Sequence, residues 1–387
     1  MHIGILLPGF SQDERDPAIP VQLNLVRELA RRDSVRVLAL RYPFERRIYT
    51  VAGAEVHALG AGPVRGLHRL KLWADALIHL RQMHRKQPFD LLHAMWADET
   101  GLIAAWAGRW LGIPVVVSVA GGEPVWLADI GYGLQGSAFS RWTIRQALNG
   151  ADRIVVASRY SQCLIENIIG TGKVSSDGKM AYIPLGVDAA HFRPALSSGS
   201  NHGKLIHVAS LIGVKDQATL LRAMTQLPDH ITLEIIGEGP ERARLELLTA
   251  ALGIQHRVQF AGAVPHQELP KHYQRASLHV LTSRHEGQGM VTLEAAACGL
   301  PTVSTAVGIV PDDPELGVYV PVGDDAALAG AITALLENTE QLRARSRNAR
   351  TAVEACYAIQ HTVTQLRDLY RDLTSQSTEA SFIPANH

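Results

Sequence analysis

Short apolar runs alternate with longer segments of mixed polarity along almost the whole chain. Runs rich in Val, Ile and Leu are typical of parallel strands that are buried on both faces of a sheet. The segments between them carry apolar residues at helical spacing. We therefore predict an α/β protein in which helices connect parallel strands. The predicted strands cover residues 2–7, 35–40, 54–59, 90–95, 114–119, 153–158 and 180–185 in the first half, and 205–211, 231–236, 258–262, 278–282, 301–306 and 317–322 in the second.

A short polar segment divides these strands into two groups. Residues 195–203 are small and polar without hydrophobic periodicity, so we interpret them as a linker. A length of 387 residues also favours two domains. We predict doubly wound, Rossmann-like domains over residues 1–194 and 204–358, facing a cleft that binds ligands at the carboxyl ends of the strands. Residues 359–387 are predicted to form a last helix and a frayed tail.

The strand predicted at 278–282 leads into the stretch with the most candidate chemistry. A Gly-rich loop follows it, and then a short helix that begins at Met290 and stops before Gly299. Glu286 lies in the loop and Glu294 about one turn into the helix, so both carboxylates can face one pocket. Spacing alone equally fits a loop charge and a solvated helix residue.

The start of this helix is also a predicted anion site. The backbone N–H groups of Gly289, Met290 and Val291 have no intrahelical partners, and the helix dipole adds positive potential there. Lys215 follows the predicted strand 205–211 and precedes another helix start, where a cation can neutralise a diphosphate. An anion site flanked by carboxylates that read hydroxyl groups fits a sugar nucleotide.

Composition narrows the class of protein further. The formal net charge is zero, so no nucleic-acid footprint is visible. The three cysteines, Cys163, Cys298 and Cys356, form neither a disulfide framework nor a zinc pattern, and a reducing compartment is expected. The chain starts directly with a predicted strand, without a signal-peptide pattern, and contains no apolar run of membrane-spanning length. We expect a cytoplasmic protein.

One basic segment leaves two interpretations open. Residues 65–86 carry six Lys and Arg side chains around leucines at helical spacing. This pattern fits an amphipathic helix that lies on anionic lipid at the inner face of a membrane. It also fits a packed surface helix with a solvated basic face, which we favour because apolar-in and charged-out is the usual pattern. A peripheral membrane contact through this segment is the alternative.

Several motifs in order resemble those of one large enzyme family. Glu286 and Glu294 form a Glu-x7-Glu pair, and the chain resembles the retaining glycosyltransferases of the GT-B fold, specifically glycosyltransferase family four (glycosyl transferases group one). The other matching stretches are Asp90–Met95, Ile183–Pro194, Val208–Asp216 and Ile235–Pro240. The resemblance implies two Rossmann-like domains and a last helix that crosses back to the first one.

The resemblance also implies a reaction. A sugar would move from a nucleotide-diphosphate sugar to a hydroxyl acceptor, a glycan, glycolipid or small molecule, with retention of anomeric configuration. Lys215 and the helix amides would stabilise charge as the glycosidic bond breaks. Glu286 would bind the transferred sugar, Glu294 the ribose, and the backbone near Val264 the nucleobase. No Asp-x-Asp triplet occurs, so neither a metal nor another cofactor is expected.

The resemblance also implies site residues at four further positions, and some of these depart from the family pattern. Three positions lie in the first half, and Ser210 lies in the second. His93 closes a predicted strand at the expected cleft edge and is a candidate catalytic residue. Gly9 stands where the family usually has two glycines. Ala120 replaces the family's sugar-binding His, beside the candidate sugar or acceptor residues Gly121, Gly122 and Glu123. Ser210 occupies the donor-binding position of an Arg, so one positive contact is missing.

Two other functions remain as alternatives. The first is another enzyme of the GT-B fold. An epimerase would need acid–base residues on both faces of the sugar, and no such pair can be placed. A pyridoxal-phosphate phosphorylase would be far longer than this chain. A family member that binds a sugar nucleotide without transferring it is favoured by Ser210 and Ala120. Both glutamates and Lys215 argue against this interpretation.

Overall fold

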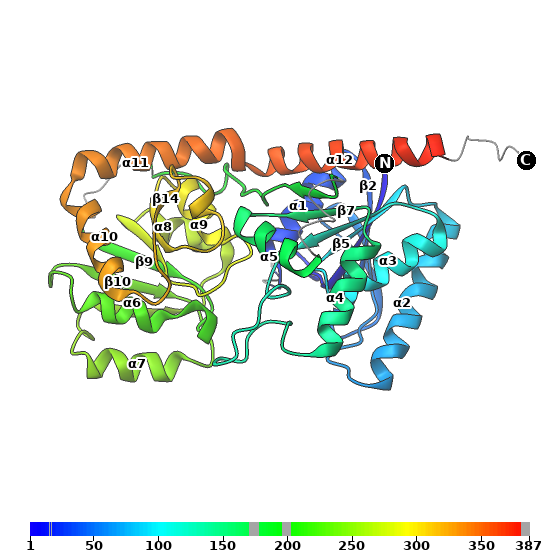
Figure 1. The fold of residues 1–387 in the computed structure, drawn as a ribbon. Coiled ribbons are helices and arrows are strands. Elements are labelled where there is room, and N and C mark those ends of the chain that lie inside the picture. The colour runs from blue at the N-terminus through cyan, green and yellow to red at the C-terminus, as the bar shows by residue number, and fades with distance from the viewer. Residues whose placement is uncertain (15, 17, 170–177, 196–202, 381–387) are drawn as a thin grey trace, which may run out of the picture.

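The computed structural model describes residues 1–14, 16, 18–169, 178–195 and 203–380. Most of the predicted linker (196–202) and the end of the predicted tail (381–387) lie outside the described residues. The chain forms two α/β lobes, each around its own sheet, and a long pair of helices runs along both of them (Figure 1). The prediction of an α/β protein with two Rossmann-like sheets is confirmed.

The first lobe is built on an eight-stranded sheet in the order β3-β4-β2-β1-β5-β6-β7-β8. Every pair in this sheet is parallel except β3 with β4, which is antiparallel. The strands are β1 (His2–Gly9), β2 (Ser34–Tyr42), β3 (Arg47–Val51), β4 (Ala54–Ala58), β5 (Leu91–Met95), β6 (Val115–Val119), β7 (Arg153–Val156) and β8 (Met180–Tyr182).

Helices cover both faces of the first sheet. On each face, an apolar core lies between the sheet and its helices. On one face lie α1 (Pro20–Ala30) and α12 (Ile359–Ala380), whose apolar side chains share a core with those of β1, β2 and β4. The other face is covered by α2 (Leu67–Lys86), α3 (Glu99–Leu111), α4 (Ala138–Gly150) and α5 (Arg159–Ile169).

The second lobe has a six-stranded, fully parallel sheet in the order β11-β10-β9-β12-β13-β14. This is the strand order of dinucleotide-binding folds, in which ligands bind where the chain direction of the crossovers reverses. Here that point lies between β9 and β12. The strands are β9 (Lys204–Val208), β10 (Thr232–Ile236), β11 (Val258–Gly262), β12 (Leu278–Leu281), β13 (Thr302–Thr305) and β14 (Gly317–Val320).

Helices again cover both faces of the second sheet. One core contains side chains of α6 (Gln217–Met224), α7 (Arg242–Ala251) and α10 (Asp325–Glu337). The other contains those of α8 (Leu269–Tyr273), α9 (Met290–Ala297) and the end of α11 (Thr339–Ala352).

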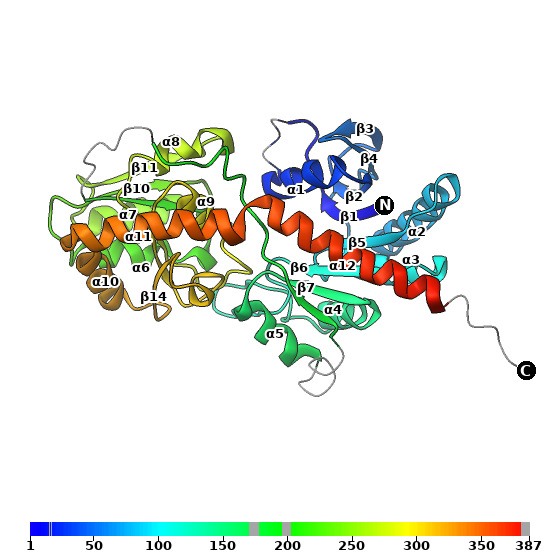
Figure 2. The same cartoon turned by 90° about the horizontal axis from the view of Figure 1, so that it is seen from above.

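Helix α12 leaves the second lobe and packs on the first, as the sequence predicted (Figures 1 and 2). Val363, Leu366 and Tyr370 are at most 5 % exposed and belong to the core of the first sheet. Arg367 pairs at 2.7 Å with Asp33, whose side chain is 1 % exposed. Apolar burial and this ion pair therefore fix the end of the chain to the lobe in which the chain begins.

Two sequence predictions need correction. Strand β3 was not predicted, because Arg47–Val51 alternates between half-buried and exposed positions at the edge of the sheet, with only Val51 buried, instead of forming an apolar run. The apolar-in pattern expected for 65–86 holds only in part, since Leu67 and Leu70 are 81 % and 53 % exposed. Within the described ranges, no helix is both long enough and apolar enough to span a bilayer.

Candidate active site between the two lobes

The loop between β12 and α9 is placed at the reversal point of the second sheet. Gly289 has φ +86°, a left-handed conformation that favours glycine, and it turns the chain sharply into α9. No side chain caps the start of α9. The first amides of this helix are therefore available to a ligand, and the dipole makes that end positive.

Lys215 and Glu286 meet across this reversal point. The Lys215 Nζ lies 2.6 Å from Glu286 Oε1, and Ser283 Oγ donates to the same oxygen at 2.5 Å. A second hydrogen bond joins the two loops, because the Thr282 hydroxyl donates to the backbone carbonyl of Lys215 at 3.0 Å. The Lys215 and Glu286 side chains keep 23 % and 11 % exposure, so the pair is shielded yet open to a ligand.

A pocket of about 330 Å³ opens beside this ion pair. The second lobe contributes Lys215, Glu286 and the start of α9, and the first lobe contributes Ala120, Ala157 and Leu185. The predicted donor residues Ser210, Gly289, Met290 and Val291 all line it. The structure thus brings six of the thirteen candidate site residues together between the lobes, all of them from the second lobe.

Glu294 lies just behind this pocket. Its side chain is 5 % exposed, and its carboxylate accepts from His266 Nε2 at 2.8 Å and from the Tyr273 hydroxyl at 3.1 Å. Burial and the neighbouring carboxylate raise the pKa of Tyr273 well above its ordinary value, so this phenol remains a donor. The sequence does not predict His266 or Tyr273 as partners, because neither belongs to a motif near Glu294.

Val264 lines a separate, larger cavity of about 690 Å³ between the lobes. Its other walls include His266 and, from the first lobe, Leu23 and Arg27 of α1. Because His266 also holds Glu294, this side chain connects the larger cavity with the region behind the smaller pocket.

The predicted sugar or acceptor loop contacts the other lobe through backbone. The Gly121 carbonyl faces His285 Nε2 at 2.9 Å, and the ring of Tyr132 packs against Gly122. Glu123 is 1 % exposed, and its carboxylate accepts from the amides of Ala97, Ala120 and Gly121. Burial raises the pKa of Glu123 to about 7 despite these amides. Glu123 organises the loop from inside and does not line the pocket.

The structure does not bring His93 to the pocket. This residue is fully buried in β5, with its Nδ1 2.5 Å from the Tyr370 hydroxyl of α12 and its Nε2 2.8 Å from Ser118 Oγ. Burial lowers the pKa of His93 to about 3. The prediction that it stands at the cleft edge is therefore corrected, because its position in the strand directs the ring toward the crossing helix.

Gly9 is also explained by packing and not by the pocket. A Cβ at this position would lie 2.8 Å from Cβ of Tyr42, the residue that pairs with Gly9 across β1 and β2. Gly9 lines neither of the two cavities described above.

The loop that carries Glu286 is held by hydrogen bonds from the first lobe. The Gly287 carbonyl accepts from Ser158 Oγ at 2.7 Å and from Ser161 Oγ at 2.8 Å. The side-chain amide of Gln288 forms a pair of hydrogen bonds with the backbone of Leu185. The sequence does not predict these contacts, because partners more than a hundred residues away along the chain leave no local signal.

An ion pair and a hydrogen bond border the same interface. Arg284 forms a two-pronged ion pair with Asp129 of the first lobe. The amide of Arg159 donates to Asp312 of the second lobe at 2.7 Å. The lobes are therefore in direct polar contact around the pocket.

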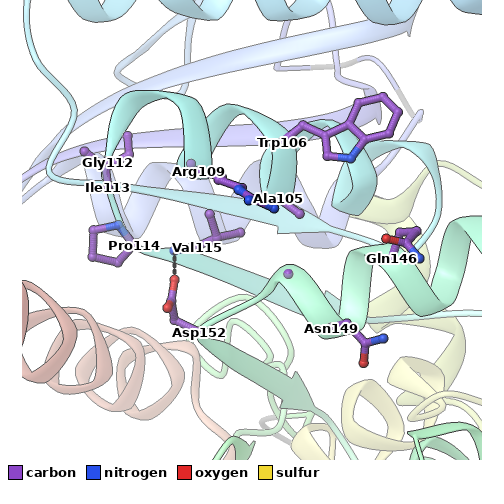
Figure 3. A pocket seen from close by; sticks show the side chains of 12 residues that line it. Ala105, Trp106, Arg109, Gly112, Ile113, Pro114, Val115, Gln146, Asn149 and Asp152 are labelled. Carbon is purple, nitrogen blue, oxygen red and sulfur yellow. Dashed lines mark hydrogen bonds between the residues drawn. The ribbon is translucent and has the colours of Figure 1, made fainter.

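A further cavity, of about 570 Å³, lies elsewhere on the first lobe (Figure 3). It is bounded by Trp106 and Arg109 of α3, by Gln146 and Asn149 of α4, and by the start of β6 at Val115. It opens at the amino end of β6, away from the pocket at the carboxyl ends, and contains no predicted site residue. Among the residues that the structure describes, no group of three or more His, Cys, Asp or Glu could hold a metal ion.

Two family models match the chain, and together they cover both lobes. The model of "Glycosyl transferases group 1" matches residues 189–352, and that of the "Glycosyl transferase 4-like domain" matches residues 19–186. A protein of Thermomonospora curvata described as D-inositol 3-phosphate glycosyltransferase is 27 % identical over 86 % of this chain and 85 % of its own length. A GDP-mannose-dependent mannosyltransferase of Mycolicibacterium smegmatis is 27 % identical over 53 % of this chain and 58 % of its own.

Solved structures share the two-lobed fold. The sucrose-phosphate synthase of Thermosynechococcus elongatus matches with a TM-score of 0.80 at 22 % identity, covering 97 % of this chain and 99 % of that one. The Anabaena protein HepE, solved in complex with UDP, matches with a TM-score of 0.73 at 20 % identity, over 96 % of this chain and all of that one. These likenesses place the lobes in the GT-B fold.

Proposed function

The chain belongs to the glycosyl transferases of group 1, and from that premise we propose that it transfers a sugar from a nucleotide-diphosphate sugar to a hydroxyl acceptor. The observation that carries this proposal is the pocket of about 330 Å³ between the lobes, where the open start of α9, Lys215 and Glu286 converge. A positive helix end and a lysine suit a diphosphate, and a carboxylate suits sugar hydroxyls. The two relatives named above, which transfer sugars, support the same class of reaction.

Each part of the pocket has a role in this proposal. Lys215 and the amides of Gly289, Met290 and Val291 hold the diphosphate and stabilise the charge that grows on it as the glycosidic bond breaks. Glu286 binds hydroxyls of the transferred sugar. Lys215 and Ser283 hold one oxygen of Glu286 before the donor binds, and we assign the carboxylate a role in binding hydroxyls and not in nucleophilic attack.

The nucleoside extends from this pocket toward the larger cavity. Glu294 binds the ribose hydroxyls, and these replace its hydrogen bond to His266 or to Tyr273. The base lies along the backbone at Val264, on the wall of the cavity of about 690 Å³. HepE, solved with UDP and also with UDP-glucose, shares this fold and supports a nucleotide-diphosphate donor.

We propose retention of anomeric configuration without a metal. The bond between the sugar C1 and the leaving phosphate oxygen breaks, and a bond from C1 to the acceptor oxygen forms on the same face. The acceptor proton passes to the leaving phosphate oxygen, so no protein base is consumed. The acceptor, a glycan, glycolipid or small molecule, enters from the first lobe near Gly121, and contact between the lobes excludes water.

A thermal-shift screen over nucleotide-diphosphate sugars tests donor binding first, since a ligand of the folded state raises the melting temperature. The sugar that stabilises the protein is then incubated with candidate acceptors, and the anomeric configuration of the product is read by NMR. A product of retained configuration, formed at the same rate with a chelator present, is expected. An inverted product or a chelator-sensitive rate would refute the mechanism.

One feature of the pocket favours a second candidate, a protein that binds the donor without transferring it. Ser210 lines the pocket where the family has an arginine, so the diphosphate has one positive contact fewer. A donor that shifts the melting temperature but is neither transferred nor hydrolysed would support this alternative.

A further inference from the structure

An exposed set of large apolar side chains lies on the first lobe, and none of them lines the pocket between the lobes. Trp106 and Trp110 of α3 are 37 % and 50 % exposed, and Phe139 and Trp142 of α4 are each 43 % exposed. Leu67 and Leu70, at the start of α2, are exposed as well. We call these six side chains the aromatic face. Large contiguous apolar surfaces of this kind are uncommon on a protein without a partner.

Three of the exposed rings, those of Trp106, Phe139 and Trp142, form one connected cluster. Buried Trp73 of α2 lies beneath it, with its ring 5.6 Å from Trp106 and 6.0 Å from Phe139. Trp142 lies 6.5 Å from Trp106 and 6.1 Å from Phe139. Three helices that are separate in sequence therefore present their aromatic side chains together. The cavity of Figure 3 adjoins this surface through Trp106.

The helices of the aromatic face carry an excess of positive charge, although the whole chain is neutral. The guanidinium of Arg69 stacks over Phe139 at 5.0 Å, and that of Arg81 over Trp110 at 4.5 Å. Helix α4 adds exposed Arg141 and Arg145 and contains no acidic residue.

The acidic residues within α2 and α3 are already neutralised. Asp75 of α2 pairs with Arg46, and Glu99 of α3 pairs with both Arg41 and Arg69. The outward charge of this surface is therefore basic, and its complement must be anionic.

We propose that the aromatic face docks the protein on an anionic lipid bilayer. Trp and Phe are the side chains that settle at the boundary between headgroups and acyl chains, and arginines beside them reach the phosphates. Helix α2 packs on the sheet through Trp73 and Leu80, as the sequence favoured, but Leu67 and Leu70 at its start depart from that pattern and are exposed. The same exposure is what an interfacial helix requires.

Charge decides between a membrane and a second copy of the chain. A two-fold contact would bring the aromatic face against itself, and Arg141 and Arg145 of one copy would meet the basic helices of the other. Such like-charge contacts are unfavourable, whereas an anionic bilayer neutralises them. Helices α2 and α3 form the end of the molecule opposite the second lobe, so docking there leaves that lobe free (Figures 1 and 2).

Vesicle flotation of the full chain tests the proposal, with phosphatidylcholine vesicles that contain rising fractions of phosphatidylglycerol. Binding is expected to rise with the anionic fraction and to fall with salt. Tryptophan emission is expected to shift to the blue on binding, and a quencher carried on the acyl chains is expected to reduce it. This readout needs no variant, and it does not depend on the proposed sugar transfer.

Matched variants locate the contact. The pair R141E/R145E on α4 is expected to weaken vesicle binding at least about tenfold, since each basic side chain near the surface contributes about 1 kcal/mol. The control pair R343E/R347E reverses two exposed arginines of α11 on the second lobe and is expected to bind as the parent does. Trp110→Ser is expected to lower binding, whereas Leu247→Ser, which also removes an exposed apolar side chain, is not.

Three outcomes would overturn the proposal. The first is no flotation with phosphatidylglycerol vesicles at low salt. The second is equal loss in R141E/R145E and its control pair, with circular dichroism showing that both are folded. The third is a dimer in sedimentation velocity that Trp142→Ser dissociates, which would assign the aromatic face to self-association.

Discussion

At the scale of single residues, the proposed chemistry depends on the pair of Lys215 and Glu286. Each neutralises the other in a shielded position, so a bound diphosphate must compete with Glu286 for the lysine. In this proposal, donor binding releases the Glu286 carboxylate from Lys215, and the carboxylate can then bind sugar hydroxyls. The missing arginine at Ser210 makes the lysine more important still.

Lys215→Ala is expected to lower the rate of sugar transfer about a hundredfold or more, because Lys215 is the only lysine or arginine among the described residues that line the pocket. Release of the nucleoside diphosphate measures the rate, and circular dichroism checks the fold. Lys271→Ala removes an exposed lysine of α8 as the control and is expected to transfer normally. Near-normal turnover in Lys215→Ala would remove the proposed role.

His93 illustrates a residue whose contacts indicate stability and not catalysis. His93→Ala leaves the Tyr370 and Ser118 hydroxyls without their partner in a buried space, and we expect the free energy of unfolding to fall by about 2–4 kcal/mol. Urea unfolding measures this loss. The transfer rate per folded molecule at low temperature is expected to stay near that of the parent; a large loss of rate with intact stability would return His93 to the reaction.

At the scale of elements, the loop between β12 and α9 is shaped as much by the other lobe as by its own. Gly287 is in close contact with the first lobe, where a Cβ would lie 2.7 Å from the Ala120 carbonyl oxygen. Only a residue without a side chain lets the two lobes approach this closely. The helix that follows supplies the amides, and the glycine lets the first lobe approach them.

Gly287→Ala is therefore expected to hold the lobes apart. Donor binding, measured as a thermal shift, should persist because Lys215 and α9 belong to one lobe, while the transfer rate falls at least about tenfold as water enters the pocket. Gly330→Ala is the matched control, since no atom lies within 4 Å of the added Cβ on helix α10. Equal rates in the two variants would show that closure at Gly287 is unimportant.

At the scale of the whole molecule, stability should depend on pH through buried histidines. Burial lowers the pKa of His93 and of His279 to about 3 and that of His207 to about 4, from an ordinary value of 6.5. Below pH 6.5 the unfolded chain binds protons at these sites and the folded chain does not, so stability falls as the pH falls. Each histidine removes about 1 kcal/mol between pH 7.5 and 5.5.

Glu123 acts in the opposite direction. Its pKa is raised by burial to about 7, above the ordinary 4.5, so the folded chain binds a proton in this range that the unfolded chain does not, and acid stabilises it. We expect a net loss of stability on acidification, measured by urea unfolding at pH 7.5 and 5.5. Glu123→Gln removes the compensation, so its loss should be larger than that of the parent. An equal loss would show that Glu123 is ionised in the fold.

The sequence by itself determined every described strand except β3, the two-sheet architecture and the loop and helix start that line the pocket on the second lobe. Buried parallel strands leave apolar runs, and the Glu-x7-Glu unit with its helix start is local, so short stretches carry both signals. The edge strand β3 left no such run, because one side of it meets solvent.

Only the tertiary structure decided which first-lobe residues reach the pocket. Whether His93 faced the cleft or the crossing helix depended on Tyr370, 277 residues later in the chain. The grip of Ser158 and Ser161 on Gly287, and the joining of aromatic side chains from α2, α3 and α4, likewise involve partners that no local pattern specifies. The hydrophobic periodicity of the sequence indicates whether a side chain is buried. Packing between elements that are distant in the sequence decides which residues that side chain contacts.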